Sequence, residues 1–175
     1  MKGCGLVMGK GEVQLFEYFL SPGYIWLSRD PSLISTVVGS GIAVALWDGS
    51  AGYGGMNAFL YPEAPGNAER TPLYGDVAVD FLIRMFLEEG SKKKHLKAQL
   101  FGGASSGERE CTGIAMKNVS KARQVLRLAN VSVISEDTGG RMGRKIVFNT
   151  LKNEAIVYKV NMLRKGDWYP YIQDR

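Results

Sequence analysis

Ser40 comes closest, in residue type and setting, to a group that could react. It lies in the Gly39-Ser40-Gly41 corner between two β-branched runs, and glycines there allow a sharp turn that pushes a residue out of a sheet toward a ligand. A reacting side chain would be expected at position 41, but glycine has none. A serine needs a general base to act as a nucleophile near neutral pH. The chain's single histidine, His95, lies beside three lysines, where we interpret it as a surface side chain.

The two cysteines are no better placed for chemistry. Cys111 is expected to pack as a small hydrophobe, and Cys4 lies in a short N-terminal stretch. Their separation, without C-x-x-C spacing, favours a reducing compartment over a disulfide framework. With only one histidine, the sequence predicts no metal site, and we expect no cofactor.

Length and composition favour one globular domain spanning residues 1–175, since 45% of the residues are hydrophobic and 22% are charged. No apolar run approaches the roughly 20 residues that cross a bilayer, so we expect a soluble, cytoplasmic protein without membrane insertion. The net charge is +5, and the only run of basic residues in the sequence is Lys92-Lys93-Lys94. We interpret that run as cations after a helix end, and we expect no nucleic-acid partner.

Hydrophobic periodicity predicts an α/β fold. Strands are predicted at 13–20, 24–28, 42–47, 56–61, 96–101, 131–135, 145–149 and 155–160, with 42–47 buried on both faces. Gly54-Gly55 is expected to form a turn before the strand 56–61. A helix is predicted over 76–89 and ends at Gly90; its expected apolar face is Ala78, Phe81, Leu82, Met85 and Phe86. Asn118 is expected to cap a second helix that Asn130 ends. The core then covers about 13–160, and 161–175 is an aromatic extension that we expect to dock.

The stretch 35–62 reads STVVGSGI from Ser35, LWD at 46–48 and GGMNAFLYP at 54–62. It resembles the nucleophile region of the chemoreceptor glutamine deamidases, the CheD family of bacterial chemotaxis. The family pattern is roughly T-x-L-G-S-C-V, a strand ending in Asp, and then G-G-M-N-H-F-x-x-P. Further matches are YGD at 74–76, FGGA at 101–104, Asn118, DTGG at 137–140 and GRK at 143–145.

The resemblance implies a fold as well as a site. It predicts a layered sandwich of mixed β-sheets flanked by helices, similar to the catalytic domain of the cytotoxic necrotizing factor toxins. The family's catalytic Cys corresponds to Gly41, its catalytic His to Ala58 and its assisting Thr to Ser35. We therefore expect a pocket formed by Ser35, Gly39, Ser40, Gly41, Asn57 and Ala58, with Gly41 and Ala58 facing each other.

Covalent deamidation of glutamine needs a thiolate, an imidazole and an orienting group, and two of these three are missing. We therefore expect a family member that binds without catalysing. The resemblance implies that its partners are helices of methyl-accepting chemotaxis receptors or a CheC-type phosphatase. Arg141 and Arg144 are candidate contacts for a partner carboxylate, although a loop arginine paired with Asp137 is an equally good interpretation.

Two alternatives stay open at this point. One is an active deamidase with a relocated nucleophile, or a chain whose natural Cys and His were replaced by design. The other is a small-molecule-binding module that reuses the vacated pocket. Neither the oligomeric state nor the choice of partner follows from the sequence.

Overall fold

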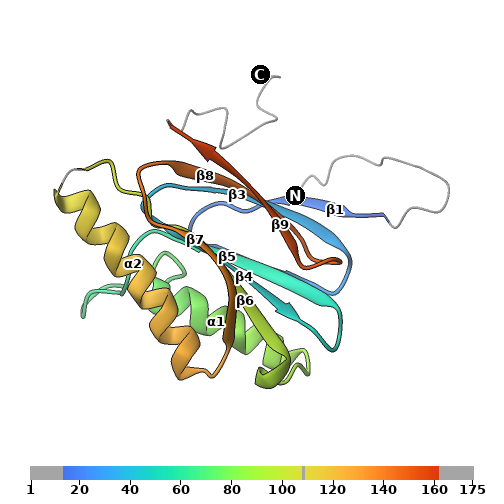
Figure 1. The fold of residues 1–175 in the computed structure, drawn as a ribbon. Helices are drawn as coiled ribbons and strands as arrows, with labels where there is room; N and C mark the ends of the chain where they lie inside the picture. Colours follow the sequence, from blue (N-terminus) through green and yellow to red (C-terminus); the bar gives the residue numbers. More distant parts are fainter. Residues whose placement is uncertain (1–13, 108, 162–175) are drawn as a thin grey trace, which may run out of the picture.

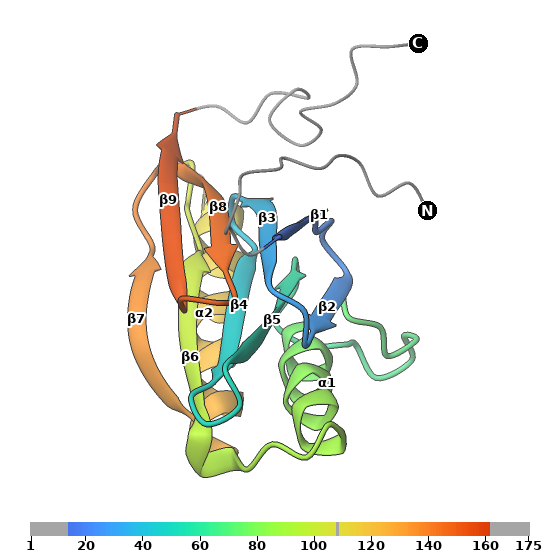
Figure 2. The same cartoon turned by 90° about the vertical axis from the view of Figure 1, so that its right-hand side faces the viewer.

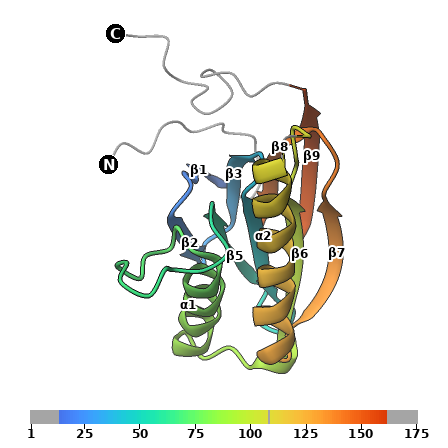
Figure 3. The same cartoon turned by 90° about the vertical axis from the view of Figure 1, so that its left-hand side faces the viewer.

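The computed structural model describes residues 14–107 and 109–161, with the side chains of 109–112 left out. It has three layers (Figure 1). A five-stranded sheet forms the middle layer, two helices cover one of its faces (Figure 3), and a four-stranded sheet covers the other (Figure 2). The predicted layered α/β sandwich of mixed sheets is confirmed.

Both sheets are mixed. The five-stranded sheet has the order β2-β5-β4-β6-β7, antiparallel except for the β6–β7 pair. Its strands are β2 (Tyr24–Ser28), β4 (Ile42–Asp48), β5 (Tyr53–Phe59), β6 (Leu96–Gly102) and β7 (Ser132–Thr138). The four-stranded sheet has the order β1-β3-β8-β9, with only β1–β3 parallel. Its strands are β1 (Phe16–Phe19), β3 (Ser32–Val38), β8 (Gly143–Asn149) and β9 (Glu154–Val160).

Both helices end at the residues that the sequence predicts. Helix α1 (Gly75–Glu88) ends at Gly90, whose φ is 90°, and α2 (Arg109–Leu128) ends at Asn130, whose φ is 57°. At each end the chain adopts the left-handed conformation that lets following backbone N–H groups bond the last helical carbonyls. A single 3₁₀ turn, Lys93–His95, connects α1 to β6. The three lysines therefore follow the end of α1, as expected, although none of them lies in its last turn.

Two apolar clusters form the core, one on each face of the central sheet. Central strand β4 serves both: Ile42, Val44 and Leu46 face the helices, and Ala43 and Ala45 face the second sheet. This confirms the strand buried on both faces. The buried face of α1 includes the expected Ala78, Leu82 and Phe86, together with Val79 and Ile83. Met85 is only partly buried, and Phe81 is half exposed, so the predicted burial of Phe81 is wrong.

Two predicted boundaries are wrong. Helix α2 begins nine residues before Asn118, which is fully buried inside it and caps nothing. Gly54 and Gly55, expected in a turn, lie inside β5, where a Cβ on Gly55 would come 2.7 Å from the carbonyl oxygen of Trp26. Glycine is needed there for close approach of two backbones and not for a turn. The expected docking of the aromatic extension concerns residues outside the described ones.

Candidate functional site

The Gly39-Ser40-Gly41 corner connects β3 to β4 and packs against the end of β6. Two backbone hydrogen bonds hold it there: the N–H of Gly103 donates to the carbonyl of Gly41 at 2.8 Å, and the N–H of Ala104 donates to that of Gly39 at 2.8 Å. Gly102 and Gly103 adopt positive φ values of 118° and 67°, which glycine tolerates without strain. Glycines on both sides therefore let two loops pack backbone to backbone.

Asn118 ties this corner to helix α2 and to the end of β5. Its side-chain amide donates to the carbonyl of Ser40 at 2.9 Å and to that of Leu60 at 2.8 Å. The side chain is fully buried, and its oxygen has no hydrogen-bond partner among the described residues. Sequence reasoning missed this role because asparagine is commoner at helix caps than in buried helix interiors.

Gly41 has no room for a side chain. A Cβ built on its backbone would lie 2.4 Å from the carbonyl oxygen of Phe59 and 3.3 Å from a methyl carbon of Leu60. Ordinary contacts to a Cβ are longer than about 3.4 Å, so backbone would have to move for any side chain to fit. The neighbouring strand occupies the space that a reacting group at position 41 would need.

Ala58 and Asn57 point to opposite faces of β5. Ala58 is fully buried in the cluster between the two sheets, opposite Ala43 and Tyr24 in the strand register. Asn57 is buried toward the helices, where its amide donates to the carbonyl of Ala78 at 2.9 Å. Gly41 lies beside Phe59, so positions 41 and 58 come to the same end of neighbouring strands, but Asn57 does not share their face.

Of the neighbouring residues Ser35 and Thr36, it is Thr36 whose hydroxyl points to the inner face of β3. Ile34 and Val38 belong to the cluster between the sheets, and side chains alternate along a strand, so Thr36 points inward and Ser35 outward. Thr36 is fully buried and donates to the carbonyl of Leu20 at 2.7 Å. The sequence gives no clear signal for it, because Val37, on the face of Ser35, is as apolar and as buried as Val38.

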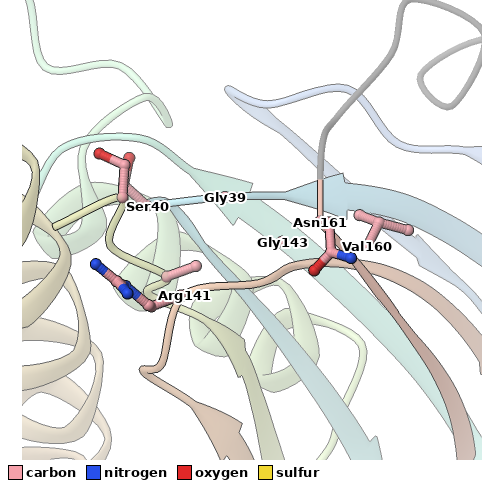
Figure 4. Close-up of a pocket in the computed structure, with 8 residues that line it drawn as sticks. Gly39, Ser40, Arg141, Gly143, Val160 and Asn161 are labelled. Atoms are coloured by element: carbon pink, nitrogen blue, oxygen red, sulfur yellow. The ribbon is translucent and has the colours of Figure 1, made fainter.

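A pocket of about 230 Å³ opens to solvent beside the corner (Figure 4). Ser40 and Arg141 lie at one side of it, and Val160 and Asn161 lie at the other. The rest of its lining is small: Gly39, Ala104, Ser106 and Gly143. Of the predicted pocket residues, only Gly39 and Ser40 line it; Ser35, Gly41, Asn57 and Ala58 are not among its lining residues.

The charges next to this pocket centre on Asp137. Arg144, whose side chain is only 3% exposed, contacts this carboxylate at 2.8 Å, and the ammonium of Lys159 lies 3.5 Å from it. Burial opposes ionisation of Asp137, but the two cations outweigh burial and hold the pKa of that carboxyl below its ordinary value. The pairing of Arg144 with Asp137 is confirmed. Arg141 is exposed and forms no ion pair with another described residue.

His95 lies at the other end of the sheet from Ser40. In the β4–β6 register, the pair Asp48 and Leu96 marks one end, and the pair Ile42 and Gly102 marks the other. Seven residues of strand span roughly 20 Å, which is far beyond hydrogen-bond reach. His95 lines a separate polar hollow with Asp48, Tyr53 and Ser91. It is therefore no base for Ser40 in this conformation.

The remaining candidate groups add nothing to the site. Cys4 and the side chain of Cys111 fall outside the described part of the chain. Within that part, no three His, Cys, Asp or Glu side chains are grouped to hold a metal ion. The two described helices are also not of the length and apolar character that would cross a membrane.

Comparison with known proteins gives a consistent set of relatives. The profile described as CheD chemotactic sensory transduction matches residues 61–159. A probable chemoreceptor glutamine deamidase CheD of Trichlorobacter lovleyi is 41% identical over 144 residues, which cover 81% of this chain and 89% of the relative. The corresponding proteins of Anaeromyxobacter dehalogenans and Rhodospirillum rubrum are 36% and 38% identical, covering 81% and 79% of this chain and 81% and 80% of the relatives.

Proposed function

This chain belongs to the CheD family, and from that membership and the geometry of its site we propose that it binds chemoreceptor helices without deamidating them. The relatives reported above are described as probable chemoreceptor glutamine deamidases. On this proposal the chain binds the same class of partner as these relatives but does not deamidate it. Chemoreceptor signalling helices are cytoplasmic, so the proposal also implies that location.

One observation supports the absence of catalysis. The resemblance matches the family's Cys to Gly41, and a Cβ there would lie 2.4 Å from the Phe59 carbonyl oxygen. The side chain is absent and its place is taken by the neighbouring backbone. The family's His corresponds to Ala58, which is fully buried and offers no proton acceptor. Neither attack on an amide carbon nor protonation of leaving ammonia has a group to perform it at these positions.

The pocket favours a partner's side chain over a free small molecule. Pockets that bind small molecules usually enclose about 300–1,000 Å³, whereas this one holds about 230 Å³ and is open to solvent. A larger hollow of about 440 Å³ lies between helix α2 and the start of the loop after β5, lined by Met116, Lys121 and Pro62 among others. The small, open pocket beside the corner would suit a partner that lies across the surface and inserts a side chain.

The proposal is tested with the cytoplasmic fragment of a chemoreceptor that carries glutamine at its modification sites. We expect binding without ammonia release above the uncatalysed rate. A family member with the catalytic Cys and His serves as the positive control for release. Ammonia release that alkylation of Cys111 or a Ser40→Ala change abolishes would reveal a relocated nucleophile and refute the proposal.

The same binding experiment decides between partners. A CheC-type phosphatase is the other partner that the family resemblance implies, and it is measured in parallel. Binding to the phosphatase alone would replace the receptor as the partner while leaving the absence of catalysis intact. Binding to neither would refute the proposed function as a whole.

A further inference from the structure

The pocket beside the corner is positively charged in the part of the chain that the structure describes. Arg141 lines it and pairs with no described carboxylate, and Arg144 and Lys159 both lie at Asp137. Arg141 is thus the charged side chain among the described lining residues, and the neighbouring cluster of Arg144, Lys159 and Asp137, which does not line the pocket, has two cations against one carboxylate. An excess of positive charge beside a concave surface attracts an anionic group.

The neutral groups of the pocket would also accept a carboxylate. Ser40 and Ser106 contribute hydroxyl donors, and the glycine and alanine positions leave the floor uncrowded. Position 41, being glycine, places no thiolate next to the pocket to repel an anion. The described lining residues include no acidic side chain.

Charge is what separates the two forms of a receptor modification site. Glutamine and glutamate side chains have nearly the same shape. A guanidinium can donate two parallel hydrogen bonds to a carboxylate, whereas an amide offers a single oxygen and turns its own N–H donors toward the cation. A pocket edged by an unpaired arginine therefore favours glutamate.

We propose that this pocket holds the carboxylate of a receptor glutamate, so that the chain recognises the deamidated form of a modification site instead of the glutamine form. This inference rests on the proposed function, because the glutamate is presented by a chemoreceptor helix. It assigns the pocket a specificity and gives Arg141 the role of contacting the carboxylate. No covalent step is involved.

Three versions of one receptor cytoplasmic fragment test the inference, with glutamine, glutamate or glutamate methyl ester at the modification sites. The methyl ester removes the charge while keeping the oxygen atoms. We expect the glutamate form to bind about tenfold more tightly than the other two, as a charge-assisted hydrogen bond implies. The preference should shrink as ionic strength rises, because the pocket is open to solvent and to screening ions.

Arg141→Gln is the informative variant, and Arg127→Gln is its matched control. Arg127 is also exposed. It lies nine residues, or about 13 Å along α2, beyond Asn118, the residue that bonds Ser40 at the pocket, so it is not part of the pocket. We expect Arg141→Gln to equalise the affinities for the three fragments and Arg127→Gln to leave the preference unchanged. Arg141→Lys, which keeps the charge but loses the planar fork, should retain part of the preference.

The outcomes separate this inference from the proposed function. Equal binding of all three fragments by the natural chain would overturn the carboxylate specificity while receptor binding stands. A glutamate preference that survives in Arg141→Gln would overturn the assignment of the pocket. Absence of binding to every fragment would overturn both. If Arg141→Gln failed to fold, the three fragments measured on the natural chain would still decide the specificity.

Discussion

Replacing Gly41 with alanine should destabilise the fold, although it adds a single methyl group. The new Cβ would lie 2.4 Å from the carbonyl oxygen of Phe59, about 1 Å inside an ordinary contact. Relieving the clash moves the corner or the end of β5, and overpacking of this kind costs about 1–3 kcal/mol. The N–H of Gly103 donates a hydrogen bond to the carbonyl of Gly41. Movement of the corner would therefore also weaken a hydrogen bond that contributes about 0.5–1.5 kcal/mol.

The opposing effect is smaller. Alanine restricts the unfolded chain and recovers about 0.4–1 kcal/mol where the native backbone suits it. We therefore expect a net loss of about 1–3 kcal/mol, which lowers the Tm by about 2–4 °C per kcal/mol in a chain of this size. Urea unfolding followed by circular dichroism measures the loss, and the m value reports whether the native state has loosened.

Gly66→Ala is the matched control, because a Cβ at that exposed position meets no atom within 4 Å and its φ is not positive. It should change stability by less than about 0.5 kcal/mol. If Gly41→Ala proved as stable as Gly66→Ala, the corner would have room for a side chain. In that case Gly41→Cys combined with Ala58→His would be expected to restore glutamine deamidation. With the corner closed as described, we expect that double variant to be unstable or inactive.

Three further predictions concern the surroundings of the site. Asn118→Ala removes two buried hydrogen bonds and should lower stability by about 1–3 kcal/mol, whereas the exposed Gln124→Ala should not; equal Tm values for the two variants would contradict the bracing role. The pKa of Asp137 is lowered in the folded state, so its contribution to stability is present above the ordinary value of about 3.9 and is lost as pH falls below it. Asp137→Asn, which leaves Arg144 without its partner, should therefore be less stable than the natural chain at pH 7, with the difference shrinking below about pH 4; a difference independent of pH would refute this. Removing 162–175 should lower the Tm or change the oligomeric mass if the aromatic extension docks, and no change in either would refute docking.

The elements that could be predicted are those whose signal is local. Strand β4 is an apolar run closed by Asp48-Gly49, and α1 has a strong 3.6-residue periodicity closed by Gly90. In such segments the local residue pattern alone indicates which residues are buried and where the element ends. Their bounds in the structure differ from the expected ones by at most one residue at either end.

The missed features depend on distant parts of the chain. Asn118 reads as a helix cap, but its partners lie 78 and 58 residues away, so nothing in the surrounding sequence indicates a buried mid-helix position. Gly55 reads as a turn residue, but the close carbonyl of Trp26 in β2 is what requires glycine. In both cases a tertiary contact decides what local propensity leaves ambiguous.

The site shows how one residue of register matters. Ser35 and Thr36 are adjacent hydroxyl residues on the same strand, and only the position of Ile34 and Val38 between the two sheets tells which hydroxyl points inward. Assigning the family's assisting residue by spacing alone selects the outward-facing serine. The closure of the corner at position 41 is likewise a property of backbone placement, which residue types do not encode.

The order of the strands also imposes an order of assembly. All five strands of the central sheet come from residues 24–138, whereas β3 must wait for β8, with Leu33 paired to Asn149. Closing so long a loop is slow, so the second sheet should form last during folding. Until then, the apolar face of the central sheet that includes Ala43, Met56 and Ala58 is exposed to solvent and prone to aggregation. Pulsed hydrogen exchange should therefore protect amides of β4 and β5 before those of β3 and β8, and a chain released before β8 is made should aggregate.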